Sequence, residues 1–284
     1  MAVYVGLDIG GTKLMVAAAD ESGKMLRRVM KPTPLALQEG LDLLHGMIAE
    51  AAAGEPIAGM GAAIGGPLDW RTGVVSPLHQ PQWRDVPLRA MMEARWGCPF
   101  TVDVDTNVAA LGEYHADGEA LDPMLYLTVS TGMGGGLVTG GQLYRGASGA
   151  HPEVAHQSIP YRCANPDGLV CECGLPDCLE ALVSGNGIRR IYRRPAEELD
   201  AAQWDEVAYN LGQGLRNLAV ILAPAVIVLG GGVAVGGGAL FIQAVERVMR
   251  AHLRLVPAPK VKLSSLGYDT ALIGALVVAR VGLG

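Results

Sequence analysis

The stretch that decides the fold is VYVGLDIGGTKLMVAAAD, which occupies residues 3–20. An apolar run at residues 3–8 leads to the pair Gly10-Gly11, and a second apolar run follows at residues 13–19. We interpret this order as two strands joined by a tight turn. Backbone N–H groups in a glycine turn can approach an anion closely, because no Cβ atom stands in the way. The stretch is therefore a candidate phosphate-binding hairpin.

Three polar residues beside this turn strengthen that interpretation. Asp8 lies at the end of the first strand, where a carboxylate can hold Mg²⁺ through water. Thr12 and Lys13 add a hydroxyl and a cation. An ordinary β-hairpin would explain the two glycines alone, but the run Asp-x-Gly-Gly-Thr-Lys is considerably more specific.

A related pattern returns at residues 124–146, MLYLTVSTGMGGGLVTGGQLYRG. We predict a strand at residues 124–129, a Thr/Gly turn at 131–136 and a second strand at 137–144. The chain thus carries two similar hairpins, each of which opens one half of the protein. If the two halves face one another, both hairpins line one cleft.

The remaining segments alternate between helical and strand patterns, which indicates an α/β protein. Further strands are expected at residues 57–64, 100–105, 225–229 and 260–266. Helices are expected at residues 36–53, 86–96, 106–115, 203–223, 239–253 and 269–281, with a glycine turn at 230–238.

Asp105 stands where the strand at residues 100–105 gives way to a helix. Ligands bind at the carboxyl ends of strands in open α/β sheets, so Asp105 is a candidate general base. A plain helix N-cap explains the same position equally well. The residues alone leave both roles open.

Residues 153–180 combine the ligand types of a structural zinc site. Thiolate and imidazole suit this borderline-soft cation, and CECGLPDC at residues 171–178 contains three of the five cysteines. Two acids, Glu153 and Glu180, flank the cluster. A zinc ribbon for nucleic acid is disfavoured, because the surroundings are acidic and no basic stripe accompanies them. The four expected ligands are His156, Cys171, Cys173 and Cys178.

Composition and charge exclude several other classes of protein. The chain has 22 basic and 28 acidic residues, a net charge of −6, which argues against nucleic-acid and membrane-surface binding. The N-terminal segment has no basic region and reaches Asp8 early, so it does not resemble a signal peptide. Residues 218–242 are uncharged, but Pro224 and two glycine triplets favour a buried strand with a turn over a membrane span. We expect a soluble, cytoplasmic protein in a reducing compartment, without membrane or nucleic-acid partners.

Five motifs in this order resemble the ROK family of sugar kinases, a branch of the hexokinase/actin-like ATPase superfamily. They are DIGGTK (8–13), STGMGGG (130–136), GASGAHPEVAH (146–156) with CECGLPDCLE (171–180), VLGGGVA (228–234) and DTALIGA (269–275). The resemblance covers nearly the whole chain. It implies an α/β, two-lobed actin-like ATPase fold of the ribonuclease H-like type, with an interlobe cleft and a structural zinc loop.

The resemblance also implies how the chain divides into domains. Residues 1–115, completed by a C-terminal helix at 268–284, would form the first lobe. Residues 116–267 would form the second lobe, with the zinc motif and the dimerisation surface of a homodimer.

Roles for individual residues follow from the same resemblance. Asp105 would be the catalytic base, removing a proton from the sugar hydroxyl as it attacks the γ-phosphate. His156 would bind structural Zn²⁺ together with the three cysteines. ATP and Mg²⁺ would be bound by Asp8, Gly10, Gly11, Thr12, Lys13, Thr131, Gly132, Gly134, Gly135, Gly230, Gly231 and Gly232. The sugar would contact Gly66, His79, Asp105, Glu153, His156 and Glu180.

The chain departs from the family pattern in four places, two of which concern sugar contacts. Val104 and His79 each replace an asparagine that usually contacts the sugar, and Ala155 stands where glycine is usual. The segment between His156 and the first cysteine ligand is longer than the family norm and contains Cys163. Loss of amides that bind hydroxyls can shift discrimination between substrates by orders of magnitude.

We therefore expect an ATP-dependent kinase that transfers the γ-phosphate to a hydroxymethyl group of a hexose, as a glucokinase does. The alternative substrate is an aminohexose, such as kanosamine, N-acetylmannosamine or N-acetylglucosamine, or a cyclitol. A non-catalytic sugar-sensing regulator ranks last. Family repressors carry a winged-helix domain before the first motif, which here begins at Asp8.

Overall fold

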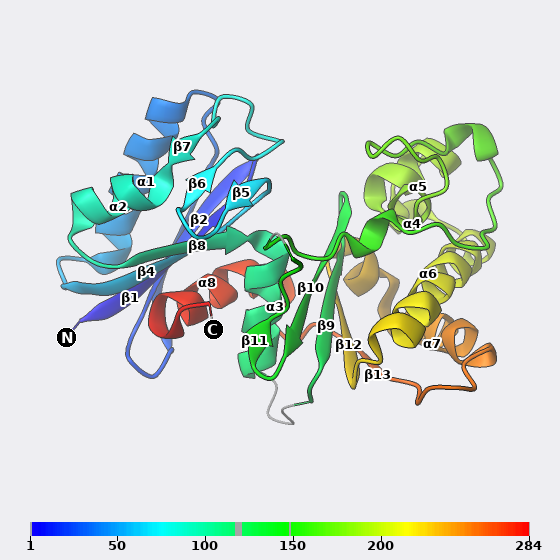
Figure 1. The fold of residues 1–284 in the computed structure, drawn as a ribbon. Helices are drawn as coiled ribbons and strands as arrows, with labels where there is room; N and C mark the ends of the chain where they lie inside the picture. Colours follow the sequence, from blue (N-terminus) through cyan, green and yellow to red (C-terminus); the bar gives the residue numbers. More distant parts are fainter. Residues whose placement is uncertain (1, 117–120, 148, 284) are drawn as a thin grey trace. The chain divides into compact units, whose positions relative to one another are not determined.

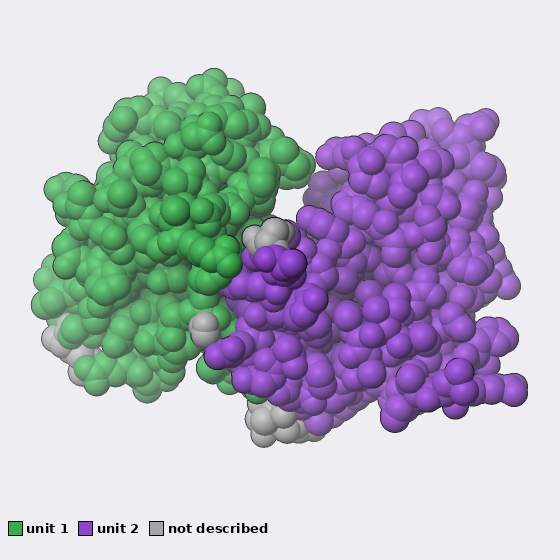
Figure 2. Space-filling model, viewed as in Figure 1, with its two compact units in different colours: residues 1–116, 269–284 green, residues 117–268 purple. Residues whose placement is uncertain are grey.

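The computed structural model of the chain describes residues 2–116, 121–147 and 149–283. The chain forms two compact units, each with its own sheet and core. Unit 1 comprises Met1–Ala116 and Asp269–Gly284, and unit 2 comprises Asp117–Tyr268 (Figure 2). The last helix therefore belongs to the unit that opens the chain.

Unit 1 is built on a five-stranded mixed sheet in the order β3-β2-β1-β4-β8. Strands β1 and β2 pair antiparallel around the first glycine turn, while β4 and β8 run parallel to β1. The strands are β1 (Val3–Ile9), β2 (Lys13–Ala19), β3 (Met25–Pro32), β4 (Ile57–Ile64) and β8 (Phe100–Val104). A second, smaller sheet contains β5 (Leu68–Asp69), β6 (Val74–Val75) and β7 (Val86–Pro87).

Helices cover both faces of the large sheet in unit 1 (Figure 1). Helices α1 (Leu37–Ala52) and α2 (Leu88–Trp96) add their apolar side chains to the core formed with β1, β2 and β4. Helices α3 (Asp105–Ala116) and α8 (Thr270–Val281) pack against each other, and α8 covers Met15 with Leu272 and Leu276. Because both faces of the central strands are buried, their sequences are nearly continuous apolar runs.

Glycines let α8 approach the sheet and α3 closely. A Cβ atom on Gly61 would overlap the carbonyl oxygen of Ala275, and one on Gly274 would overlap that of Val108. Both clashes involve backbone atoms, which cannot rotate away as a side chain can. Only glycine permits the observed helix positions.

Unit 2 repeats the plan of unit 1. Its five-stranded sheet has the order β11-β10-β9-β12-β13, with an antiparallel hairpin first and two parallel strands after it. The strands are β9 (Met124–Val129), β10 (Met133–Thr139), β11 (Gln142–Leu143), β12 (Val226–Gly230) and β13 (Lys260–Leu263). The helices are α4 (Leu179–Val183), α5 (Gly185–Tyr192), α6 (Ala201–Leu222) and α7 (Gly232–Ala251). The two hairpins inferred from the sequence thus occupy equivalent places in two similar sheets.

The second hairpin differs from its prediction. Strand β10 begins at Met133, so the glycines at 134–136 lie inside a paired strand, whereas the sequence predicted a turn at 131–136. A Cβ atom on Gly135 would lie 2.8 Å from the side chains of Leu127 and Val154. Close packing therefore explains that glycine, and the strand predicted at 137–144 is instead interrupted by a turn at Gly140-Gly141.

The glycine turn predicted at residues 230–238 is also wrong. Helix α7 begins directly after β12, and its backbone leaves the helical conformation only at Gly238, where φ is 67°. Within the described parts of the chain, α7 is the one helix long and apolar enough to cross a membrane, a test that core helices also pass. The break at Gly238 and the packing of α7 on α6 favour a helix that packs on the protein over a membrane span.

Candidate active site

Two carboxylates lie at the carboxyl ends of the parallel strands of unit 1. Asp8 belongs to β1, and Asp105 follows β8 as the first residue of α3. The pairings of Ile9 with Ile64 and of Ile64 with Val104 align the ends of β1, β4 and β8. The structure therefore places both acids at one edge of the sheet.

The electrostatic environment of Asp8 favours a cation. The pKa of the Asp8 carboxyl is raised to about 7; burial is the largest cause, the carboxylates of Asp105 and Asp269 also raise it, and Lys13 lowers it. A divalent cation beside Asp8 would reverse this penalty. Oxygen ligands of this kind suit Mg²⁺, which usually binds through one or two carboxylates and water. The residues present thus fit the expected magnesium ion.

Asp105 is held at the junction of strand and helix by its own neighbours. Its Oδ1 atom accepts a hydrogen bond from the backbone N–H of Thr106 at 2.7 Å. Asp103 is buried and accepts bonds from Val104 N at 2.6 Å and Asn107 Nδ2 at 3.2 Å, which fixes the start of α3. Asp105 itself is exposed.

The loop that carries His79 and Gln80 contacts the first glycine turn. Gly10 O accepts hydrogen bonds from Thr33 Oγ1 at 2.7 Å and Gln80 Nε2 at 3.4 Å. A Cβ atom on Gly11 would lie 3.3 Å from His79 Cβ. His79 therefore lies against the phosphate hairpin, where its side chain is exposed, as are those of Thr12 and Lys13.

Gly66 completes the group of predicted site residues in unit 1. It follows β4 and precedes a cis peptide bond to Pro67, and its carbonyl oxygen accepts a bond from Leu78 N at 3.0 Å. A Cβ atom on Gly66 would lie 3.7 Å from a methyl group of Val104. The structure thus places Gly66, Val104 and Asp105 beside one another, with an apolar surface where an amide would be usual.

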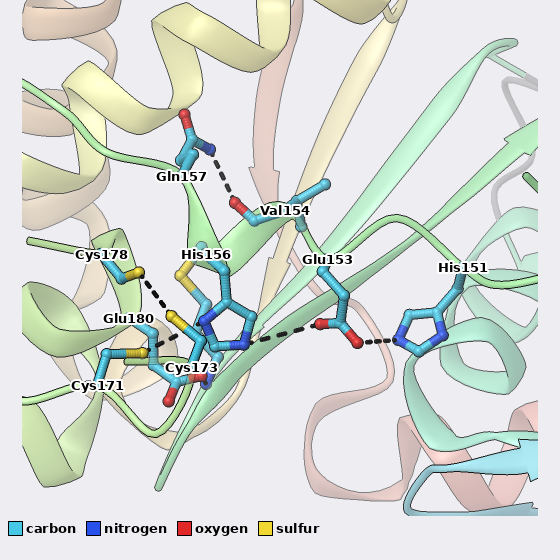
Figure 3. A network of polar contacts seen from close by, with 10 residues as sticks. His151, Glu153, Val154, His156, Gln157, Cys171, Cys173, Cys178 and Glu180 are labelled. Carbon is cyan, nitrogen blue, oxygen red and sulfur yellow. Dashed lines mark hydrogen bonds and ion pairs between the residues drawn. The ribbon is translucent and has the colours of Figure 1, made fainter. Parts of the chain in front are cut away.

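In unit 2 the structure brings the four expected zinc ligands together. One ligand atom from each of His156, Cys171, Cys173 and Cys178 lies within 4.8 Å of all the others. Cys171 Sγ is 3.3 Å from His156 Nδ1, and Cys173 Sγ is 3.2 Å from Cys178 Sγ (Figure 3). Bonds of about 2.3 Å to sulfur and about 2.0 Å to nitrogen place tetrahedral zinc ligands roughly 3.5 Å apart, so the cluster fits zinc.

The pKa values of the three thiols bear on whether all of them can be ionised at once. Hydrogen bonds, first from the backbone N–H of Leu175, lower the pKa of Cys173 to about 7. Burial raises the pKa of Cys171 and of Cys178. Three thiolates at this spacing therefore need a bound metal to exist together near neutral pH.

Glu153 lies between two histidines (Figure 3). One of its carboxylate oxygens is 3.9 Å from His156 Nε2, and the other is 3.4 Å from His151 Nε2. Nδ1 of His156 faces the thiol of Cys171, and Nε2 lies on the side of Glu153, where metal-bound histidines often have a supporting carboxylate. Sequence reasoning missed His151. Its spacing of two residues from Glu153 was the signal that could have found it.

Glu180 connects the zinc cluster to the second hairpin. Its Oε2 atom accepts a hydrogen bond from Met133 N at 3.3 Å, and a Cβ atom on Gly132 would lie 3.8 Å from it. Thr131 is exposed in the same turn, and its carbonyl oxygen accepts a bond from Asn186 N at 3.0 Å. The turn at 131–132 is thus braced by α4 and α5.

Close packing and backbone conformation explain why Gly230 and Gly231, in the third glycine segment at residues 230–232, are glycines. A Cβ atom on Gly230 would overlap the Tyr126 hydroxyl, and Gly231 has a φ of 85° beside the carbonyl of Val129. Gly232 begins α7, and a Cβ atom there would be 3.8 Å from the Tyr268 hydroxyl. Its predicted contact with adenosine stays a prediction.

Two sheets of the same plan, each opening with a hairpin and followed by parallel strands, define the actin-like ATPase fold with an added zinc loop. The sequence profile of the ROK family matches residues 4–281. The chain belongs to the ROK family, as its motifs predicted.

Known proteins resemble the chain over nearly its whole length. A ROK hexokinase from Thermus thermophilus is 35% identical with a TM-score of 0.85, and the match covers 98% of this chain and 97% of that one. A ROK family glucokinase from Streptomyces griseus, solved with glucose and AMPPNP, is 29% identical with a TM-score of 0.79, covering 98% and 99%. The N-acetylmannosamine kinase of Salmonella paratyphi A is 32% identical, covering 97% of this chain and 98% of the relative.

Proposed function

We propose that the protein is an ATP-dependent sugar kinase that phosphorylates a hydroxymethyl group of a hexose. The observation that carries the proposal is the pair Asp8 and Asp105 at the strand ends of unit 1, beside the Gly10-Gly11 hairpin. Family membership and the names of the relatives agree with this function.

Asp105 is the general base in this proposal. The hydroxymethyl oxygen attacks the γ-phosphorus, the new O–P bond forms, and the bond from phosphorus to the bridging oxygen of ADP breaks. Asp105 takes the hydroxyl proton. Such a base contributes roughly 10²–10⁴-fold to the rate, and most of the remaining acceleration comes from positioning and charge neutralisation.

The hairpins and the magnesium ligand supply that neutralisation. The proposed ligands of the ATP phosphates are backbone N–H groups of the turn at residues 10–12 and Lys13 in unit 1, and backbone N–H groups of the turn at 131–132 in unit 2. Asp8 would hold Mg²⁺, and the bound ion would supply positive charge beside the phosphate oxygens. Zn²⁺ would take part in no step, and its four ligands would fix the loop that carries Glu153 and His156. The carboxylates of Glu153 and Glu180 accept hydrogen bonds from sugar hydroxyls, and the imidazole of His156 donates one.

Glucose is the first substrate to test, and an aminohexose is the second. The methyl surface of Val104 beside Asp105, and His79 beside the first hairpin, leave fewer amide partners for ring hydroxyls. The Salmonella relative named for N-acetylmannosamine adds a reason for the second candidate. A homodimer in the cytoplasm is also part of the proposal, on family resemblance.

A coupled ATP assay tests the proposal. Glucose, N-acetylated and free aminohexoses, and cyclitols are compared for the wild type and Asp105→Asn. We expect the variant to lose kcat by about 10²–10⁴-fold with unchanged melting temperature and zinc content. The kinase assignment fails if no substrate gives turnover that depends on Asp105.

A further inference from the structure

The loop between the zinc ligands His156 and Cys171 is anchored on α6 by its middle. Arg162 N donates to Asn210 Oδ1 at 2.8 Å, and Asn210 Nδ2 donates back to Arg162 O at 2.8 Å. Asn210 is 1% exposed, so both bonds are shielded from water. These two hydrogen bonds hold the backbone of the long loop in place at Arg162, so the position from which the Arg162 side chain extends is fixed.

Arg162 stands at the rim of a groove between α6 and α7. The groove has a volume of about 330 Å³, and small residues such as Ala208 and Ala244 line its floor. Arg247 and His252 from the end of α7 line it as well. Pockets for small molecules begin at roughly 300 Å³ and combine an apolar floor with a few polar groups, as here.

The charges around this groove are unbalanced. Two arginines, Arg162 and Arg247, line the groove with a single carboxylate, Asp205. Neither arginine forms an ion pair with any residue that the structure describes. In a chain whose net charge is −6, unpaired cations gathered at one hollow point to an anionic ligand.

Arg162 distinguishes this groove from a helix C-terminus that merely carries basic residues. Cations near the last turn of α7 are explained by the helix dipole alone. Arg162 comes from a different segment, and its Cζ atom lies 3.8 Å from the centre of the Tyr209 ring. A guanidinium stacked in this way keeps its N–H edge free for two parallel bonds to a phosphate.

We propose that this groove is a second binding site, which takes a small phosphate monoester. The phosphate lies between Arg162 and Arg247, and the organic part covers the alanine floor. Because Arg162 belongs to the loop that also carries His156, the bound ligand also stabilises the zinc loop. The inference does not depend on the kinase assignment.

The test measures binding by calorimetry with inorganic phosphate, phenyl phosphate and a hexose 6-phosphate, and with phenol as the probe without phosphate. Arg247→Glu reverses a charge at the rim on an exposed residue, so the fold is retained. Arg254→Glu is the matched control, since Arg254 is also exposed but does not line the groove. We expect Arg247→Glu to weaken binding of phenyl phosphate about ten-fold or more, and the control to change it less than about two-fold.

Three outcomes would overturn the proposal. Phosphate esters could bind no better than phenol, or both charge reversals could weaken binding equally. The third is a shift of the oligomeric state by Arg247→Glu without ligand, which would make this face a contact between copies of the chain. Binding of the esters but not of inorganic phosphate would support the proposal and assign a role to the alanine floor.

Discussion

The carboxyl group of Asp8 gives this protein an unusual dependence of stability on pH. Its pKa is about 7 in the folded protein and 3.8 in the unfolded chain. As pH rises from 4 towards 7, the unfolded chain releases this proton first, so the free energy of unfolding falls. Asp8→Asn removes the titrating group, and the variant should lack this loss.

The magnitude follows from the size of the shift. One pKa unit corresponds to about 1.36 kcal/mol, so between pH 5 and pH 8 the wild type should lose roughly 3 kcal/mol relative to Asp8→Asn. Mg²⁺ added at pH 8 should restore part of this loss in the wild type, because it binds the ionised carboxylate. It should have no such effect on the variant.

Urea unfolding in magnesium-free buffer measures this difference. Trp70, Trp83 and Trp96 lie in unit 1, so tryptophan fluorescence reports mainly the unit that contains Asp8. Comparing the two proteins at each pH cancels the other titrating groups, which both share. Parallel pH profiles for the wild type and Asp8→Asn would refute the reasoning about burial and neighbouring charge.

Other changes test the zinc site, the sugar side and the packing of α8. Cys178→Ser should release zinc and destabilise unit 2, since binding of structural zinc contributes on the order of 10–16 kcal/mol of apparent free energy. A variant that keeps stoichiometric zinc and an unchanged melting temperature would contradict the assignment. His151→Ala should raise the KM for sugar about five-fold, because Glu153, a proposed sugar ligand, loses its contact with His151. The kcat and the zinc content should stay unchanged, and His151→Gln should restore the KM. A KM that stays constant in both variants would exclude His151 from substrate binding. Gly274→Ala should lower the free energy of unfolding by about 1–3 kcal/mol, because the added methyl group overlaps Val108. Gly46→Ala, in open space on α1, should raise it by up to about 1 kcal/mol. The denaturant midpoints of the two variants test both expectations.

The first hairpin and the zinc cluster were predictable because local patterns specify them. Apolar runs around Gly10-Gly11 specify two strands and a turn, and ligand types at short spacing specify the metal site. The hairpin at 131–136 was not predictable in detail, since Gly135 is required by contacts with Leu127 and Val154, which no local pattern reveals.

Other features depend on distant parts of the chain. Gly231 and Gly238 both have positive φ, yet only the first lies at a boundary between strand and helix, so glycine alone could not locate the start of α7. The groove beside Arg162 is formed by two helices and a loop that are distant in sequence, so no single stretch of sequence predicts it. The only sequence signal for His151 was its spacing of two residues from Glu153, and that spacing alone does not show that the two side chains meet.

The division of unit 1 between the two ends of the chain has a consequence for synthesis. Its strands leave the ribosome early, but α8 is made only after the whole of unit 2. Until then the apolar face around Met15 lacks Leu272 and Leu276, its partners in the finished core. The growing chain can complete unit 2 while one apolar face of the first sheet is still uncovered, and exposed surfaces of this kind promote aggregation until the final helix covers them.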